Sequence, residues 1–325
     1  MKLPRRRFLQ LAAGTVAAPS VVRGAFALDY PTRPVRLVVG FPPGGSVDIL
    51  ARLIAQRLSD QLGQPFVIEN RPGGGTNLAT EMVARADPDG YTLLQATGSN
   101  AWNATLYSHL SFDFIRDIIP IASIARTFGV MEVNPSVPAH TVAEFIAYAK
   151  ANPGKIYMAS SGPGSAPHLW GELFKMMAGV DLVTVHYRGT GPALPDLMSG
   201  RVQVMFDAIL SSIEHIRAGR LRPLGVTTLT RTTALPDVPP VAETVPGYEA
   251  GGWMGIAAPA KTPAEIIDKL NKEVNAALAD EKFAARLTEL GAAPFSGSPA
   301  DFAKFIAADT GKWAKVIKFA NLKAD

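Results

Sequence analysis

Four loops rich in glycine contain the residues whose types and spacing best suit chemistry in this chain. Each loop follows a short apolar run and precedes a segment with helical spacing. Glycine lets the backbone approach a ligand closely, and the first N–H groups of a helix are unpaired and carry a partial positive charge. These loops therefore indicate an anion site. They are Phe41–Ser46, Arg71–Asn77, Ser160–Ser165 and Arg188–Pro192.

The anion expected at these loops is a carboxylate rather than a nucleotide phosphate. Neither Gly-Lys pair in the chain is followed by Ser or Thr, so the phosphate-binding P-loop motif is absent. The run from Gly162 to Pro167 lacks the last glycine of the dinucleotide fingerprint. These absences argue only weakly against a nucleotide, and they leave a small organic acid as the favoured ligand.

The histidines and serines predict no strong catalytic or metal site. His168 and Glu172 lie one helical turn apart, but two ligands are a weak argument for a metal, and packing is the expected role. Ser165 near His168 resembles a nucleophile with a base, yet residues three apart at a helix start are usually capping groups. Zero cysteines exclude disulfides and thiolate chemistry. We expect no metal, no cofactor and no enzyme, with a Ser–His hydrolase as the alternative.

Three aromatic residues and one carboxylate are further candidates for a pocket. Phe41, Trp102 and Tyr187 are candidates for its walls, although aromatic side chains are more often part of a core. Asp207 ends an apolar run, where it would bind a ligand cation or donor, or else serve as a turn residue. The two interpretations of Asp207 have equal weight at this point.

Short apolar runs alternate with amphipathic segments along the body of the chain. This alternation predicts an α/β fold with mainly parallel sheets flanked by helices. Strands are expected at residues 35–40, 66–70, 91–96, 118–125, 130–133, 156–159, 182–187, 202–208, 224–228 and 253–258. Helices are expected at residues 47–62, 78–86, 141–151, 167–178, 193–198 and 211–219, with two more that start at Thr262 and Ser298.

Two crossings of the chain predict a pair of lobes with a ligand cleft between them. Residues 117–133 are rich in strand patterns without a helix, and residues 236–252 are rich in Pro and Gly. The block between these crossings has the size of a domain. We therefore expect lobe 1 at residues 28–128 and 251–325 and lobe 2 at residues 129–250, closing on a ligand by a hinge.

The basic character of the chain belongs to its N-terminus. The net charge is +4, but the first 27 residues hold five basic residues and no acid, which leaves a body near −1. A nucleic-acid partner is therefore not expected. Arg5 and Arg6 resemble the pair of a twin-arginine export signal, and Ala25-Phe26-Ala27 is an A-x-A cleavage site. We expect a signal peptide at residues 1–27, cleavage after Ala27, and a soluble periplasmic protein.

The chain beyond this signal resembles the Bug-type receptors, the extracytoplasmic solute-binding proteins of tripartite tricarboxylate transporters. The resemblance covers nearly the whole of that region, and together its motifs are highly specific. The motifs are Tyr30-Pro31-x-Arg33-Pro34-Val35, Phe41-Pro42-Pro43-Gly44-Gly45-Ser46-x-Asp48, Glu69-Asn70-Arg71-Pro72-Gly73, Asp89-Gly90-Tyr91-Thr92, Asn152-Pro153-Gly154-Lys155, Gly162-x-Gly164-Ser165-x-x-His168, Tyr187-Arg188-Gly189-x-Gly191-Pro192, Leu235-Pro236-Asp237-Val238-Pro239 and Trp253-x-Gly255-x-x-Ala258-Pro259.

The resemblance implies a two-lobed periplasmic-binding-protein fold of type II-like form and a receptor without catalytic activity. It implies that a ligand carboxylate is bound at the loops that begin at Phe41 and Ser160, and that membrane permease subunits are the partners. From the loops and the resemblance together, the expected ligand-binding residues are Phe41, Gly44, Gly45, Ser46, Thr76, Ser99, Asn100, Ser160, Gly164, Ser165, His168, Tyr187 and Asp207. We expect a monomer. An orphan receptor used for sensing or signalling is the alternative with the same fold.

Two residues depart from the expected pattern. His186 stands where members of the family commonly have proline, so the rim of the pocket is expected to differ. Glu132 interrupts an apolar strand, where a charged residue is either exposed at an edge or paired. The ligand is left open between a dicarboxylate, a tricarboxylate, an aromatic acid and an amino acid.

Overall fold

The fold is known from a computed structural model, which describes residues 29–324. Contacts along the chain separate residues 1–30 from a compact unit of residues 31–325, and the fold given below is that of the second unit. The predicted signal peptide at residues 1–27 lies outside the described residues. None of the described helices is long and apolar enough to cross a membrane.

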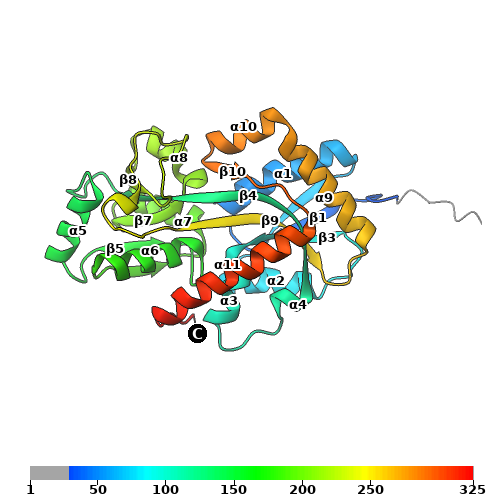
Figure 1. Cartoon of the computed structure of the whole chain (residues 1–325), viewed down its shortest axis with the longest axis horizontal. Helices are drawn as coiled ribbons and strands as arrows, with labels where there is room; N and C mark the ends of the chain where they lie inside the picture. The colour runs from blue at the N-terminus through cyan, green and yellow to red at the C-terminus, as the bar shows by residue number, and fades with distance from the viewer. Residues whose placement is uncertain (1–28, 325) are drawn as a thin grey trace, which may run out of the picture. The chain divides into compact units, whose positions relative to one another are not determined.

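One sheet runs through this unit (Figure 1). Its strands follow the order β2-β1-β3-β9-β4-β7-β5-β6, and β8 and β10 each pair with β4. The strands are β1 (Val35–Val39), β2 (Phe66–Asn70), β3 (Thr92–Thr97), β4 (Ile118–Val133), β5 (Tyr157–Ser160), β6 (Val183–His186), β7 (Val204–Ala208), β8 (Arg222–Val226), β9 (Gly251–Pro259) and β10 (Ala292–Pro294).

The two ends of the sheet are parallel, whereas its middle is antiparallel. β1 pairs in parallel with β2 and β3, and β5 pairs in parallel with β6 and β7. β4 and β9 are antiparallel to each other and to the other described strands that they pair with. The α/β fold is therefore confirmed, but the expectation of mainly parallel strands is corrected to a mixed sheet. The antiparallel pairs all involve β4 or β9, the two strands in the middle of the sheet, which run in opposite directions.

The strand predicted in two pieces, 118–125 and 130–133, is a single strand of 16 residues, β4. Its first part, up to Phe128, pairs with β9 and β10, and its last part, from Gly129, pairs with β7 and β8. The partners change in the middle of this strand, next to Gly129. The lobe boundaries at residues 128/129 and 250/251 stay a prediction.

Helices connect these strands and cover both faces of the sheet. They are α1 (Ser46–Leu62), α2 (Asn77–Ala84), α3 (Gly98–Leu106), α4 (Phe114–Asp117), α5 (Val142–Ala151), α6 (Ala166–Ala178), α7 (Thr190–Met198), α8 (Ile209–Arg217), α9 (Ala264–Ala279), α10 (Glu281–Glu289) and α11 (Pro299–Phe319), with short 3₁₀ turns at Gly74–Thr76 and Val241–Glu243. All four glycine-rich loops join a strand to a helical segment, as the sequence predicts.

Two helices differ from the sequence prediction. Helix α3 was not expected, because its first turn, Gly-Ser-Asn, has low helix propensity and the segment is held by burial against the sheet. Helix α8 begins at Ile209 rather than after a cap at Ser211, because the hydroxyls of Ser211 and Ser212 bind buried carboxyl groups and no N–H. Tertiary contacts thus decide both helix starts.

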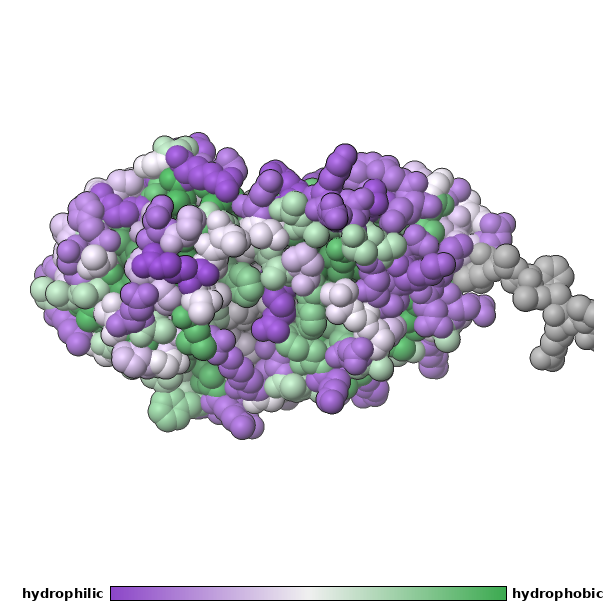
Figure 2. Space-filling view, turned by 45° about the horizontal axis from the view of Figure 1, so that its top comes forward, coloured by the Kyte–Doolittle hydropathy of each residue, from purple (hydrophilic) through white to green (hydrophobic). Residues whose placement is uncertain are grey.

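Alternation along the strands places a core on each face of the sheet. In β5 and β7, Met158 and Phe206 join the larger core under α6, whereas Ala159 and Met205 join the smaller core under α7. Every residue of β3 is buried, as expected for a strand covered on both faces. Figure 2 shows hydrophilic residues over most of one face of the molecule, with paler and hydrophobic residues gathered towards the middle of that face.

Candidate functional site

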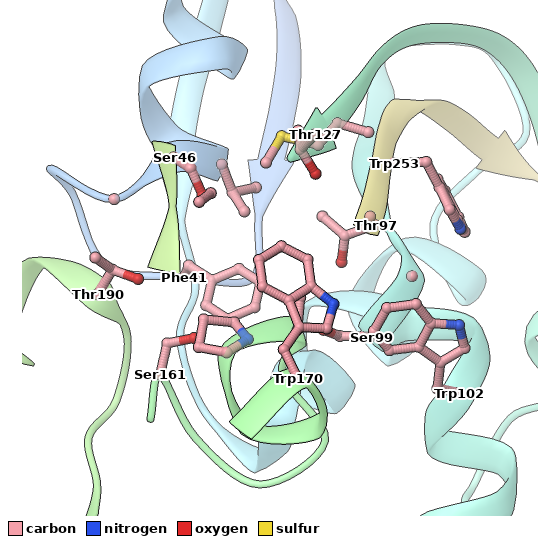
Figure 3. Close-up of a pocket in the computed structure, with 18 residues that line it drawn as sticks. Phe41, Ser46, Thr97, Ser99, Trp102, Thr127, Ser161, Trp170, Thr190 and Trp253 are labelled. Atoms are coloured by element: carbon pink, nitrogen blue, oxygen red, sulfur yellow. The ribbon is translucent and has the colours of Figure 1, made fainter. Parts of the chain in front are cut away.

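A narrow cavity lies where strands of both sheet ends finish and the following helices begin (Figure 3). The space open to the centre of a water molecule is about 50 Å³. One wall comes from β1, β3 and the segments after them, with Phe41, Gly45, Ser46, Val47, Thr97, Gly98, Ser99 and Trp102. The opposite wall comes from the segments after β5, β6 and β7, with Ser161, Ala166, Pro167, Trp170, Thr190 and Ala208. The crossing strands add Thr127, Gly252, Trp253 and Met254.

Within residues 29–324, no charged side chain lines this cavity. Positive potential comes instead from the N-termini of the helices that begin there, which favour an anion. Helices α1, α7 and α8 follow Gly45, Gly189 and Ala208, and none of these three residues caps its helix with a side chain. Their first N–H groups therefore remain available to a ligand.

The hydroxyl groups of the cavity divide into donors and acceptors. Among the described residues, the hydroxyls of Ser46, Ser99 and Ser161 have no hydrogen-bond partner, so each is free to donate to a ligand. The hydroxyl of Thr190 donates to Asp207 at 3.0 Å, and that of Thr97 donates to Asn100 at 2.9 Å. These two threonines therefore offer the cavity only acceptor lone pairs.

Three tryptophans line the cavity, and their indole N–H groups differ. The N–H groups of Trp102 and Trp253 both donate to one carboxylate oxygen of Asp309 on α11, at 2.8 and 2.9 Å. Burial raises the pKa of Asp309, and these two N–H groups partly offset the effect. The indole nitrogen of Trp170 is buried and has no partner among the described residues. A buried donor left unpaired costs about 1–3 kcal/mol.

Loops that follow strands from the two ends of the sheet touch each other. A Cβ atom added at Gly191, at the start of α7, would lie 2.5 Å from the carbonyl oxygen of Pro43. A Cβ atom added at Gly75 would lie 2.8 Å from the carbonyl oxygen of Pro163. Glycine is needed at these two points because only a residue without a side chain permits so close an approach.

The loop before α1 is braced by Asp48 in the first turn of that helix. Its carboxylate accepts the N–H of Gly44 at 3.1 Å, and it binds Arg52 and Asn70 at 2.9 Å. Burial raises the pKa of Asp48, but these hydrogen bonds outweigh burial and lower that pKa overall. Asn70 also donates to the carbonyl oxygen of Phe41 at 2.9 Å. Asp48 thus fixes the position of the loop through these hydrogen bonds, and its carboxylate stays charged.

The loop before α6 is held by Ser165 and His168. The Ser165 hydroxyl donates to the carbonyl oxygen of Gly162 at 2.7 Å and accepts the N–H of His168. The His168 Nδ1 atom accepts the N–H of Gly164 at 3.2 Å. Burial, and next the adjacent His186, lower the pKa of His168 to about 4, so its ring is neutral at neutral pH. Ser165 does not bond to the His168 ring, so the nucleophile–base contact of the alternative Ser–His hydrolase is not formed.

Asp207 and Glu132 lie behind the cavity wall rather than in it. Asp207 accepts hydrogen bonds from the hydroxyls of Thr190, Ser211 and Ser212, and burial raises its pKa. The Ser212 oxygen also lies 2.7 Å from Glu132, and one hydroxyl proton cannot serve both carboxyl groups. Burial, and next the charge of Asp207, raise the pKa of Glu132 well above its usual value. Glu132 is therefore buried beside Ser212 rather than exposed at an edge.

Of the thirteen predicted site residues, Phe41, Gly45, Ser46 and Ser99 line the cavity. The other nine lie outside this lining, in the loops or behind them. Gly44 has a φ of +86° and no atom within 4 Å of an added Cβ. Ser160 lies 2.7 Å from Nδ1 of His186, and Tyr187 donates to Asp196 at 2.8 Å.

Thr76 and Asn100 form a buried cluster next to the start of α3. Asn100 donates to the hydroxyls of Thr76 and Thr80 and accepts the N–H of Thr97 at 2.8 Å. Thr76 has a φ of +85°, an uncommon conformation for a β-branched residue. This cluster fixes the segment from Thr97 to Ser99, which does line the cavity.

Several lining residues were missed from the sequence. Ser161 and Thr190 lie within the predicted loops, and Trp253 lies within a quoted motif, so their signal was present without a reason to choose them. Trp170 gave no signal, because an aromatic residue inside a helix usually belongs to a core. Among residues 29–324, no group of three or more His, Asp or Glu side chains is placed to hold a metal ion.

Comparison with known proteins identifies the family. The model of the tripartite tricarboxylate transporter family receptor matches residues 50–322. The chain belongs to this family. Protein BugT of Bordetella pertussis is 34% identical over 320 residues, which cover 98% of each chain.

Solved structures of similar proteins have the same fold. An R. palustris protein with adipate is 42% identical, with a TM-score of 0.89 over 90% of this chain and 99% of that one. MatC from Rhodopseudomonas palustris with bound malate is 33% identical, with a TM-score of 0.84 over 89% of this chain and 100% of that one. The receptor therefore has the two-lobed fold of periplasmic binding proteins, as predicted.

Proposed function

We propose that this receptor binds a small carboxylate in the cavity between β1–α1 and β5–α6 and delivers it to the membrane subunits of a tripartite tricarboxylate transporter. The observation that carries the ligand class is the lining itself. Uncapped helix starts at Ser46 and Thr190 and free serine hydroxyls supply donors, while the described lining has no charged side chain. The adipate and malate of the two R. palustris proteins support the same class of ligand.

The role is that of a binding protein without catalysis. Its loops are held by paired side chains, and His168 uses its ring as an acceptor for a backbone N–H. We expect a periplasmic monomer that is exported by the signal at residues 1–27 and that closes its two lobes on the ligand. Membrane permease subunits are the expected partners.

Isothermal titration calorimetry of the purified protein tests this function. Adipate and malate are the first probes, with benzoate, citrate and aspartate as further acids. We expect binding to at least one of them, only modestly weakened by salt, because the donors are backbone and hydroxyl groups in a narrow cavity rather than a cationic surface. Absence of binding to every acid, together with hydrolysis of an ester or amide, would contradict the receptor function.

A further inference from the structure

The indole N–H of Trp170 stands out because it is a buried donor at the cavity with no partner among the described residues. The side chain is fully buried, and it lines the cavity together with Trp102 and Trp253. Those two tryptophans are already paired with Asp309. An unpaired donor at this position needs an acceptor that the described part of the chain does not supply.

The Trp170 ring is held in place by its surroundings. A Cβ atom at Gly129 would lie 2.6 Å from the Trp170 ring, so this glycine makes room for the six-membered ring. The hydroxyl of Tyr248 donates to the Trp170 carbonyl oxygen at 3.1 Å. The indole is therefore closely packed on the Gly129 side, and the Tyr248 bond fixes the backbone that carries it.

The polar groups of the cavity gather at two ends. In Figure 3, Ser46, Ser161 and Thr190 lie on one side of the Phe41 and Trp170 rings. The indole nitrogen of Trp170 lies on the other side, towards Thr97 and Ser99 at the start of α3. The aromatic rings separate these ends, so a matching ligand has an apolar middle and a polar group at each end.

We propose that the indole N–H of Trp170 donates a hydrogen bond to a ligand carboxylate oxygen at the end of the cavity where α3 begins. The Ser99 hydroxyl, in the first turn of α3, is a second donor for the same negative group. This inference rests on the proposed function and deepens it. It selects an aliphatic acid with acceptors at both ends, and it disfavours an ammonium group beside Trp170, because two donors would then face each other.

Calorimetry with adipate on the wild type, Trp170→Phe, Trp102→Phe and Trp253→Phe tests this donor. We expect Trp170→Phe to weaken adipate binding by about 10-fold or more, the size of a lost hydrogen bond to a charged acceptor. The probe 6-aminohexanoate replaces one carboxylate by an ammonium group. The wild type is expected to bind adipate more tightly than this probe. In Trp170→Phe, the ratio of the two dissociation constants should be smaller.

A ligand-free measurement tests the unpaired state of the N–H directly. All three variants lose similar volume, but Trp102→Phe and Trp253→Phe also break a bond to Asp309, so Trp170→Phe should lower Tm the least. In the ¹⁵N-labelled wild type, the indole resonance of Trp170 should move on addition of adipate. This readout does not depend on any variant folding.

The outcomes separate the two proposals. If Trp170→Phe binds adipate as tightly as the wild type, the proposed hydrogen bond from Trp170 is contradicted. The same holds if the Trp170 resonance does not move on addition of adipate. The receptor function is not affected by either result. Absence of wild-type binding to every acid overturns the receptor function, and with it the ligand of this donor. A Tm loss in Trp170→Phe that matches the loss in Trp253→Phe shows that its N–H was already paired.

Discussion

Three helices that begin at the cavity differ from four helices that begin elsewhere in the molecule. Helices α4, α5, α10 and α11 begin with Asp113, Thr141, Asp280 and Ser298, and each of these side chains accepts an N–H of the first turn. Helices α1, α7 and α8 begin at the cavity without any side-chain cap. Helices α3 and α6 also begin at the cavity, but Thr97 and Ser165 cap their first turns. The first-turn N–H groups left open to a ligand are therefore those of α1, α7 and α8.

The tryptophans show a second difference, among side chains that all line the cavity. Trp102 and Trp253 have their N–H groups paired with Asp309, whereas that of Trp170 is open among the described residues. Both contrasts predict that the free energy of unfolding is lower than it would be if every N–H group at the site were paired. Such a loss of stability is common at binding sites. The predictions below test this contrast, from the largest expected effect to the smallest.

The neutral ring of His168 is expected to give the largest effect. Its pKa in the folded protein is about 4, against the ordinary histidine value of 6.5, so between these values the unfolded chain binds more protons than the folded one. The stability from the neutral ring is complete above pH 6.5 and is lost as the pH falls towards 4, by up to about 3 kcal/mol. Urea unfolding at pH 7 and pH 4.5 measures this loss.

The variant His168→Gln is the control for that measurement. Glutamine does not titrate, so the loss of stability between pH 7 and pH 4.5 should be smaller in the variant. Equal losses in the two proteins would show that His168 is not the titrating group.

A substitution at the close contact between the loops is expected to give the second largest effect. Gly191→Ala places a Cβ atom against the Pro43 carbonyl, and overpacking of this kind costs about 1–3 kcal/mol. We expect adipate affinity to fall by about 10-fold or more, because both loops contribute residues to the cavity lining. Gly311→Ala, in α11 with no atom within 4 Å of its added Cβ, is the matched control, and its affinity should equal that of the wild type. Unchanged affinity in Gly191→Ala would mean that the loops separate freely in the bound state.

A cap introduced at the cavity is expected to give the smallest effect and the sharpest contrast. Gly45 has the extended conformation of a cap residue, and an added Cβ would lie 3.5 Å from its nearest neighbour, so Gly45→Ser fits. The new hydroxyl would accept an α1 N–H, which should raise stability by a few tenths of a kcal/mol and weaken adipate binding. Thermal unfolding and calorimetry measure the two effects.

Ser298→Ala removes a cap far from the cavity and reverses this pattern. It should lower stability by about 1 kcal/mol and leave adipate affinity unchanged. A variant at Gly45 with higher stability and full affinity would show that the α1 N-terminus does not contact the ligand.

Local sequence patterns predicted most of the elements because their signals are local. The strand Phe66–Asn70 and the cap at Ser298 were predicted at the positions where they lie, since apolar runs and S-P-x-D starts depend on neighbouring residues only. The patterns did not predict α3, which begins at Gly98, or the continuity of β4 through Gly129, because both depend on packing against distant segments.

The candidate site was predicted less completely for the same reason. Asp207 was chosen as a ligand contact, yet it lies behind Thr190 and binds that hydroxyl instead. Whether a side chain lines a cavity or lies behind its wall depends on the layer that it occupies in the fold. The spacing of residues along the chain does not show which layer that is.

The sequence by itself determined the family, the α/β alternation and the loops that surround the cavity. Glycine positions and helix starts are local properties, so they can be predicted from the sequence. Only the tertiary structure decided which donors stay open. Asp309 lies 207 residues from Trp102 and 56 from Trp253, and it pairs with both, while Trp170 finds no such partner among the described residues. Such pairing is set by contacts between residues distant in the chain, and only the folded arrangement brings those residues together.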